Sequence, residues 1–427
     1  MKMPVKLWMS LIFFIVFINC KKASEKGVEP MIIMPVSSTL TTYTDSVIHV
    51  RPVITPEENY TYSWAIDGKV VSLQRNLEYT SQDIGEHQVT FTVTNASNTS
   101  YDNSFKLIVL KSTLYKVMGY LPTYKSVSPQ NVRWNALSHL CYAFVGVNPD
   151  GSLNETAIDL LIETVVSEGH KNGVAVLASV GGGGTTGFST CMLNEAARKK
   201  LAANLVEFAR LTEVDGLDID FEEFDGSPTG ASDLDLQKRS ALESLYKDLR
   251  EKLPSDKLLT AAVSPSWLNP NWGYFNCYTS AMHQYLDYVG LMIYDQTGTY
   301  AASPYGQHSD FQAHFIPSIN HWLNNQHLPA KKLLAGVPFY GYKFRSTSGG
   351  LADAISYADI LLQYPNDSPE DKDNVGLIFY NGRRTIQQKA NYVSANHLGG
   401  IMIWELTHDT GDASKNLLSV IKEAFGF

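Results

Sequence analysis

The stretch Val214–Glu223, which reads VDGLDIDFEE, holds the residues best suited to chemistry. Successive side chains of a β-strand point to opposite faces. Three carboxylates would therefore share one face, namely those of Asp218, Asp220 and Glu222. Three large apolar residues would share the other, namely Leu217, Ile219 and Phe221. Neighbouring buried acids repel each other and are costly unless the protein uses them. An acidic edge strand or a calcium loop is the alternative, but calcium loops place glycine and asparagine between their acids, not large apolar residues.

The same stretch resembles the signature of a known family. From Asp215 to Glu222 it reads Asp-Gly-x-Asp-x-Asp-x-Glu, which is similar to the motif of glycoside hydrolase family 18, the chitinases and their relatives. The resemblance extends from about Tyr115 to the C-terminus. It implies a retaining mechanism in which the substrate's own acetamido group attacks, with Asp220 orienting the acetamido nitrogen.

The acids suit the roles that glycosidic bond cleavage requires. That reaction needs a proton donor for the leaving oxygen and stabilisation of an oxocarbenium-like centre. Glu222, last in the row and nearest the open strand end, is the predicted donor. Asp220 can raise the pKa of Glu222 or share its proton, and Asp218 can do the same to Asp220. Glu223 has the opposite parity and is predicted to point away.

Two further strand ends carry family-like elements. The segment ending at Gly181 and Gly182 resembles the family's Ser-x-Gly-Gly element, in which glycine lets the backbone pass close to the acids. A plain glycine-rich turn is the alternative there. Trp404 ends the last predicted strand, where the family places a tryptophan as the floor under the sugar. The alternative is that Trp404 only packs in the hydrophobic core.

The segment from Met292 to Asp295 reads Met-Ile-Tyr-Asp and is similar to the family's Met-x-Tyr-Asp element. The resemblance implies that Met292 lies at the substrate site. It also implies that Tyr294 hydrogen-bonds the acetamido oxygen, and that Asp295 holds a sugar hydroxyl or positions Tyr294.

Three aromatic residues match family positions around the same sugar, namely Tyr120, Phe144 and Tyr340. One departure follows the last of them. The family often has arginine after that Tyr-Gly pair, and this chain has Tyr342.

Composition excludes some partners. The 427-residue chain carries a net charge of −9 and has no strongly basic stretch, so no nucleic-acid partner is expected. Four cysteines with no metal-ligand spacing predict neither a disulfide framework nor a metal site, and no cofactor is expected. Cys141, Cys191 and Cys277 are interpreted as small core residues.

The N-terminus resembles an export signal. Lys2 and Lys6 precede an apolar run, residues 7–18, that is too short to span a bilayer. Cys20 follows the run, as at a bacterial lipoprotein cleavage site, although Asn19 departs from the usual small residue. Lipidation at Cys20, with a cell-envelope location, is predicted, and plain secretion is the alternative.

The pattern divides the chain into four parts: a signal over 1–20, a tether over 21–34, an all-β domain over 35–112 and an α/β domain over 113–427. Short alternating strands around Trp64, with an Asp67-Gly68 hairpin signal, predict a β-sandwich of immunoglobulin type. They resemble the polycystic-kidney-disease-like (PKD-like) domains of secreted bacterial hydrolases. A spacer is the favoured role, and a glycan-binding module is the alternative.

The pattern of the second domain predicts a (β/α)8 TIM barrel, because eight strand candidates alternate with helical stretches. The strand candidates are Tyr115–Tyr120, His139–Val145, Val174–Val180, Gly216–Glu222, Leu258–Val263, Val289–Tyr294, Leu333–Phe339 and Gly400–Trp404. The clearest helical stretches are Ile158–Asn172, Asn194–Leu211 and Leu234–Leu253. Between the last two strands, Lys343–His397 leaves room for only a small α+β insertion, which predicts a shallow, open groove.

Three functions stay open. A chitinase cleaving β-1,4 bonds between N-acetylglucosamine units is favoured, by the presence of Asp218, the Met-x-Tyr-Asp element and Trp404. An endo-β-N-acetylglucosaminidase cutting the chitobiose core of N-glycans would use the same mechanism. A non-catalytic glycan-binding barrel is the third, although such barrels usually lose the catalytic glutamate. The expected partners are therefore chitin, chitooligosaccharides or an N-glycan, with membrane contact only through a lipid anchor, for a chain predicted to be a monomer.

Overall fold

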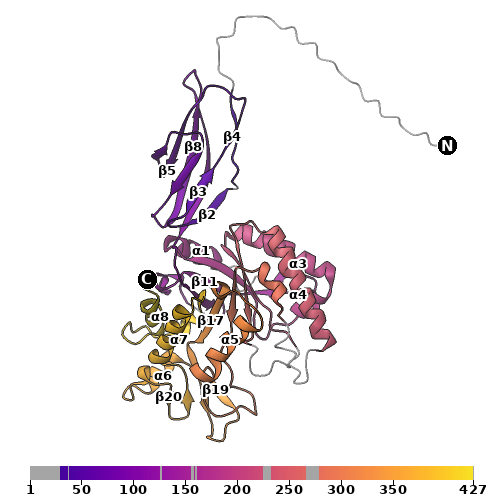
Figure 1. Ribbon diagram of the computed structural model, residues 1–427, viewed down its shortest axis with the longest axis vertical. Coiled ribbons are helices and arrows are strands. Elements are labelled where there is room, and N and C mark those ends of the chain that lie inside the picture. Colours follow the sequence, from indigo (N-terminus) through magenta and orange to yellow (C-terminus); the bar gives the residue numbers. More distant parts are fainter. Residues whose placement is uncertain are drawn as a thin grey trace, which may run out of the picture. The chain divides into compact units, whose positions relative to one another are not determined.

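The protein is described by a computed structural model of residues 29–36, 38–125, 127–154, 158, 161–224, 232–265 and 278–426 (Figure 1). The predicted signal, the predicted lipidation site Cys20 and Cys277 lie outside these residues. Among the described residues, no helix combines the length and apolar character needed to cross a lipid bilayer.

The N-terminal domain is rich in strands, as predicted. Its largest sheet has the strand order β2-β9-β8-β5-β6, and β3 pairs with β7 in a second small sheet. The ring of Trp64 is fully buried and stacks on Phe91 at 4.3 Å between centroids. Asp67 and Gly68 both have positive φ, at 49° and 78°, and form the predicted hairpin turn between β5 and β6.

The strands of this domain are β1 (Met31–Ile33), β2 (Thr39–Tyr43), β3 (Val47–Val50), β4 (Val53–Thr55), β5 (Thr61–Ile66), β6 (Lys69–Ser72), β7 (Leu77–Thr80), β8 (Gly85–Thr94) and β9 (Ser100–Leu110). Strand β1 falls within the segment predicted as a tether and pairs antiparallel with β4.

The second domain is a closed parallel barrel of eight strands, and all eight predicted strands are present. They are β10 (Lys116–Pro122), β11 (His139–Val147), β13 (Ala175–Gly181), β14 (Gly216–Asp220), β15 (Leu258–Val263), β16 (Tyr288–Leu291), β17 (Leu333–Pro338) and β22 (Gly400–Trp404). Pairing of β10 with both β11 and β22 closes the ring. A short strand, β12 (Leu153–Asn154), pairs antiparallel with the end of β11.

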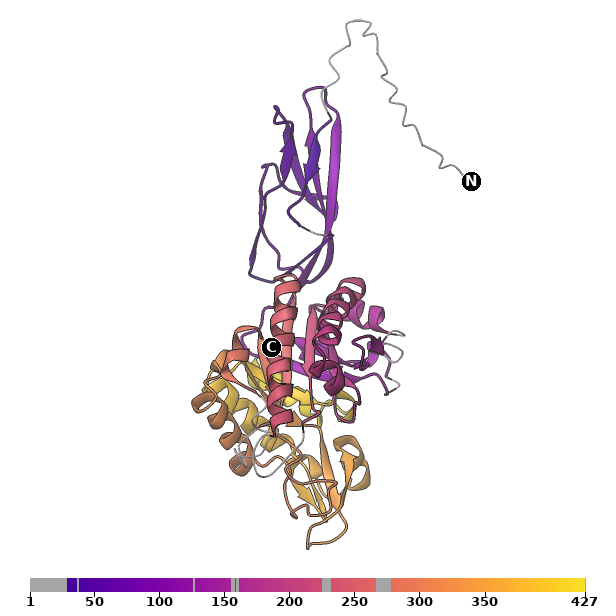
Figure 2. The same cartoon turned by 90° about the vertical axis from the view of Figure 1, so that its right-hand side faces the viewer.

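Helices surround the strands and bury the outward faces of the sheet. They are α1 (Ile162–Lys171), α2 (Phe188–Leu193), α3 (Glu195–Thr212), α4 (Asp233–Lys252), α5 (Ile316–Asn324), α6 (Tyr357–Gln363), α7 (Arg383–Ala395) and α8 (Leu417–Phe425). Helices α3 and α4 pack side by side outside the strands (Figures 1 and 2). Helix α4 begins where Ser232 and Asp235 form a capping box.

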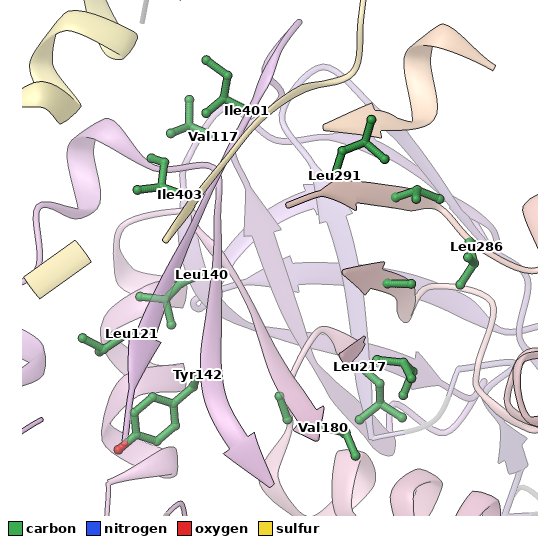
Figure 3. Packing of buried hydrophobic residues seen from close by; sticks show 14 of the residues in the cluster. Val117, Leu121, Leu140, Tyr142, Val180, Leu217, Leu286, Leu291, Ile401 and Ile403 are labelled. Carbon is green, nitrogen blue, oxygen red and sulfur yellow. The ribbon is translucent and has the colours of Figure 1, made fainter. Parts of the chain in front are cut away.

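The core between strands and helices is continuous and apolar. Figure 3 shows side chains from several strands contributing to it, among them Val117, Leu140, Leu217, Leu291 and Ile401. Because all strands are covered on both faces, their sequences are nearly continuous apolar runs.

Two strands that carry site residues end earlier than predicted, by two and by three residues. β14 ends at Asp220, so Glu222 lies in the following coil and not at the strand terminus. β16 ends at Leu291, so the whole Met292–Asp295 element lies beyond its strand. After β16 the backbone turns on itself, since Ile293 N bonds the carbonyl of Leu291 and Tyr294 N bonds the carbonyl of Met292.

The insertion between β17 and β22 is small, as predicted. It forms a four-stranded sheet of order β19-β18-β21-β20 together with α6. The strands are β18 (Tyr340–Phe344), β19 (Ala352–Ser356), β20 (Asn374–Val375) and β21 (Ile378–Phe379).

Candidate active site

The acid row begins on β14, and its alternation is as predicted. Leu217, Ile219 and Phe221 join the core that faces the helices. Asp218 and Asp220 take the other face and are almost fully buried, at 1% and 3% exposure. The barrel interior therefore receives two carboxyl groups from adjacent pleats of one strand.

Asp218 is held by three hydroxyl donors. Tyr120 donates to Oδ2 at 2.8 Å, Ser179 donates to the same oxygen at 2.8 Å, and Thr260 donates to Oδ1 at 2.6 Å. The parallel register places Ser179 of β13 and Thr260 of β15 directly beside Asp218. Burial raises the pKa of Asp218, and the three hydrogen bonds oppose that rise.

Asp220 has a different environment. Its Oδ1 is buried and has no hydrogen-bond partner among the residues that the structure describes. Burial, together with the charges of Glu222 and Asp218, raises the pKa of Asp220 well above its ordinary value. A carboxyl group with a raised pKa, and with one buried oxygen that has no partner in the described part of the chain, therefore lies between the two other acids.

Glu222 follows the strand end and approaches the glycine-rich loop after β13. A Cβ added to Gly183 would lie 3.3 Å from Oε1 of Glu222. Burial raises the pKa of Glu222 to about 7, the charge of Asp295 adds to this, and a backbone hydrogen bond from Gly183 opposes it. A carboxyl group with this pKa exchanges protons near neutral pH, as a general acid and base must.

Gly181 and Gly182 are required by the close approach of backbone and ring atoms. Their φ values are 104° and 88°. A Cβ on Gly181 would lie 2.3 Å from the carbonyl oxygen of Asp220, and one on Gly182 would lie 2.6 Å from the Phe144 ring. Gly182 N also donates to the Asp220 carbonyl at 2.8 Å, which fixes this loop beside the acid row.

An aromatic surface lies beside the acids. Trp404, partly exposed at the end of β22, stacks on Phe144 with 5.8 Å between centroids and 24° between planes. Tyr120 lies against Trp404 at 5.7 Å. The structure thus brings together three aromatic residues that are up to 284 positions apart in the sequence.

The remaining predicted residues gather around Tyr294, which is buried at 7% exposure. Burial and then the charge of Asp220 raise the pKa of the Tyr294 hydroxyl well above its ordinary value. Tyr340 packs edge-on against Tyr294 at 6.2 Å, and Met292 packs between the barrel interior and this group. Asp295 accepts a hydrogen bond from the Tyr340 hydroxyl.

The residues predicted from the motifs therefore converge at one end of the barrel, and a comparison with known families identifies the arrangement. Residues 116–409 match the model of glycosyl hydrolases family 18. The chain belongs to this family. Residues 32–95 match a PKD-like domain, as the strand pattern predicted.

Similar proteins carry chitinase names. A solved chitinase structure from Bacteroides thetaiotaomicron is 29% identical with a TM-score of 0.62, covering 73% of this chain and 97% of that chain. A class V chitinase of Lotus japonicus is 28% identical over 338 residues, covering 68% of this chain and 82% of the relative. A probable chitinase 10 of Drosophila melanogaster is 26% identical over 359 residues, covering 69% of this chain and 15% of that relative's length.

Within this family 18 barrel, the two acids that flank the row of Asp218, Asp220 and Glu222 point elsewhere. Asp215 precedes β14 and accepts hydrogen bonds from Val176 N at 2.8 Å and from His170 at 3.0 Å. Glu223 points toward α2, where it accepts from the backbone N–H groups of Phe188 at 3.1 Å and Ser189 at 2.9 Å. The parity argument placed Glu223 away from the acid row, and its observed role is to cap a helix.

Four residues were not among the predicted site residues. Ser179 and Thr260 bind Asp218, while His308 and Tyr342 bind Asp295. Thr260 had a signal, since it is the polar residue of the apolar run Leu258–Val263 and lies on the inward face. His308 had none, because it lies in a loop whose path only the tertiary structure defines.

Proposed function

We propose that this family 18 chain is a chitinase that hydrolyses β-1,4 bonds between N-acetylglucosamine units through the substrate's own acetamido group. The observation that carries the proposal is the buried Asp220, whose Oδ1 lacks a partner among the described residues although two acids flank it. A buried polar atom without a partner is costly unless a ligand supplies one. The amide N–H of an acetamido group is a donor of the required kind.

Glu222 is the proposed general acid and base. Its raised pKa, about 7, keeps the carboxyl group protonated in mildly acidic solution, and the charge of Asp295 favours this protonated form together with burial. The proton passes from Glu222 to the glycosidic oxygen as the bond to the anomeric carbon breaks. The acetamido carbonyl oxygen bonds to that carbon, which forms a cyclic oxazolinium ion.

The Glu222 carboxylate then takes a proton from water. The water oxygen attacks the anomeric carbon and opens the ring, so the product retains the original configuration. No bond between sugar and protein forms at any step. Asp220 orients the acetamido nitrogen, and the Tyr294 hydroxyl donates to the acetamido oxygen.

Asp218 acts as the fixed support of this row. With three hydroxyl donors it cannot rotate without breaking short hydrogen bonds, and its charge is held next to Asp220. Trp404 and Phe144 supply an apolar surface, which suits the flat apolar face of a pyranose ring.

The second candidate is an endo-β-N-acetylglucosaminidase acting on N-glycan chitobiose cores. The small insertion favours this candidate. A four-stranded sheet and one helix between β17 and β22 form only a low wall beside the substrate groove, which suits a bulky branched glycan better than an enclosed linear chain. The intact acid row argues against a barrel that only binds glycan. Substrate choice depends on loops more than on the barrel.

One assay distinguishes these functions. The full chain is incubated separately with chitohexaose and with a high-mannose glycopeptide, and the products are identified by mass spectrometry. Release of short chitooligosaccharides alone supports the chitinase, whereas release of a glycan ending in one N-acetylglucosamine supports the alternative. Absence of both products, with the chitohexaose still bound, would leave the non-catalytic barrel.

Export and lipid anchoring are part of the same proposal and rest on the sequence around Cys20. Labelled palmitate should enter the protein when it is expressed in a bacterial host, and Cys20→Ala should abolish the label. An unlabelled but exported protein would favour plain secretion.

A further inference from the structure

Two tyrosine hydroxyls converge on one oxygen of Asp295. Tyr340 and Tyr342 both donate to Oδ1, the second at 2.9 Å. His308 Nδ1 lies 3.7 Å from the same oxygen. Since a carboxylate oxygen has two lone pairs for hydrogen bonding, two O–H donors fill Oδ1.

The other oxygen of Asp295 is available to a ligand. Within the described residues, the hydrogen bonds to this carboxylate all end on Oδ1. The side chain is 52% exposed, although the rings that hold it are buried. The backbone is fixed too, because Asp295 has φ of 61° and its N–H lies 3.4 Å from His308 Nδ1. Asp295 can therefore present Oδ2 as a single acceptor with a defined direction.

The position of Tyr342 is built into the fold. Its side chain is 7% exposed and its ring meets the ring of His308 edge-on at 5.0 Å. A Cβ on Gly298 would lie 2.9 Å from Cζ of Tyr342. Any side chain at position 298 would thus displace the ring, and with it the hydroxyl that reaches Asp295.

We propose that Tyr342 is a positioning residue of the active site, which acts through Asp295 by filling Oδ1 and leaving the carboxylate negatively charged beside Glu222. The proposal rests on the proposed role of Glu222. It deepens that role by assigning a function to the position at which this chain departs from the arginine that the family often has. The ligand group that meets Oδ2 must be a donor, such as a sugar hydroxyl.

The charge of Asp295 links Tyr342 to catalysis. A neutral hydroxyl stabilises the ionised carboxylate without cancelling its charge, whereas a guanidinium would cancel it. Partial desolvation by the rings around it would raise the pKa of Asp295, but His308 and the two tyrosines outweigh this effect and hold the pKa below its ordinary value. The charge that remains helps to raise the pKa of Glu222.

Other titratable groups face these two carboxyl groups from several segments. They are Asp220 on β14, Tyr294 after β16, Tyr300 and His308 in the following loop, and Tyr340 and Tyr342 on β18. Because all of these groups except Tyr342 stay in place in the Tyr342 variants below, a change in the pH profile reports on position 342.

The test compares Tyr342→Phe and Tyr342→Arg with Tyr305→Phe in the full chain, using kcat/KM on a fluorogenic chitooligosaccharide from about pH 2.5 to pH 9, so that the range includes the ionisation of Asp295. Tyr305 is a matched control, since its ring packs in the same aromatic group, 5.2 Å from Phe344. Thermal unfolding confirms that each variant is folded.

Tyr342→Phe removes one donor to the ionised form of Asp295, so the pKa of Asp295 rises. The Asp295 carboxylate is then protonated at a higher pH than in the unmodified protein. The acidic limb of the kcat/KM profile therefore moves up by about half to one pH unit, which lowers kcat/KM on that limb about three- to tenfold. Tyr342→Arg compensates the charge, so Glu222 loses its proton at lower pH and the basic limb moves down by about half to one pH unit. Tyr305→Phe moves neither limb.

Folded Tyr342 variants whose two limbs coincide with those of the unmodified protein would overturn the proposal. If Tyr342→Arg fails to fold, the isosteric Tyr342→Phe decides alone. Failure of the proposed function gives a different result. If Glu222→Gln keeps full activity, Glu222 is not the group whose deprotonation causes the basic limb, and this conclusion holds for the unmodified chain as well.

Discussion

The most decisive prediction compares two adjacent glutamates, because strand geometry gives them opposite surroundings. Glu222→Gln keeps the size of the side chain but removes the transferable proton. With a pKa of about 7, roughly 90% of Glu222 is protonated at pH 6, whereas a glutamate with its ordinary pKa of 4.5 would be only about 3% protonated. The raised pKa thus increases the protonated fraction of Glu222 about 30-fold at that pH.

Loss of this donor should be severe. Positioned general acid catalysis contributes about 10²- to 10⁴-fold, so kcat of Glu222→Gln should fall by that factor while chitooligosaccharide binding survives. Hydrolysis of a fluorogenic chitooligosaccharide at pH 6 measures the rate, and titration calorimetry measures binding.

Glu223→Gln is the matched control, and its effect should appear in stability instead. Glu223 accepts from Phe188 N and Ser189 N at the start of α2, and an amide can serve only one of these donors well. Loss of a helix cap costs about 0.5–2 kcal/mol, so the free energy of unfolding should fall by that amount with turnover nearly unchanged. Chemical denaturation measures the change. The reasoning is refuted if Glu223→Gln lowers kcat as much as Glu222→Gln, or if Glu222→Gln remains active.

Two further predictions follow from the same geometry. Because burial raises the pKa of Glu222 to about 7, the acid form is lost as the pH rises through that value, and kcat/KM should decrease about tenfold per pH unit above it; a profile that stays flat to pH 9 would contradict this. Gly182→Ala should weaken chitooligosaccharide binding in calorimetry, since its Cβ would lie 2.6 Å from the Phe144 ring that supports Trp404. Gly184→Ala imposes a similar backbone conformation, φ 78°, with nothing within 4 Å of the new Cβ, and should therefore leave binding intact; equal losses in both variants would assign the effect to the backbone alone.

The barrel was predictable from the sequence because its strands are buried on both sides. Burial on both faces requires apolar residues at nearly every position, and runs such as Leu333–Phe339 carry that signal locally. The acid row was predictable for a related reason. Period-two alternation within Leu217–Glu222 assigns faces without knowledge of any neighbour.

The exact strand ends were not predictable in this way. Glu222 continues the alternation of β14, and the Met292–Asp295 element continues the apolar run of β16, yet both lie in coil. A strand ends where its neighbour ceases to pair with it, and the neighbour comes from a distant part of the chain. Pairing of β16 with β17 stops at Leu291 opposite Ala335, which no pattern near residue 291 reveals.

The sequence by itself determined which residues could do chemistry, namely Asp218, Asp220 and Glu222. It also determined that Glu223 would point the opposite way. Only the tertiary structure decided their protonation and support. The pKa of Glu222 depends on burial and on Asp295, which lies 73 positions later. Asp295 depends in turn on hydroxyls from β18 and on a loop histidine. Desolvation and charge act through space over a few ångströms, so these properties arise only when distant segments meet.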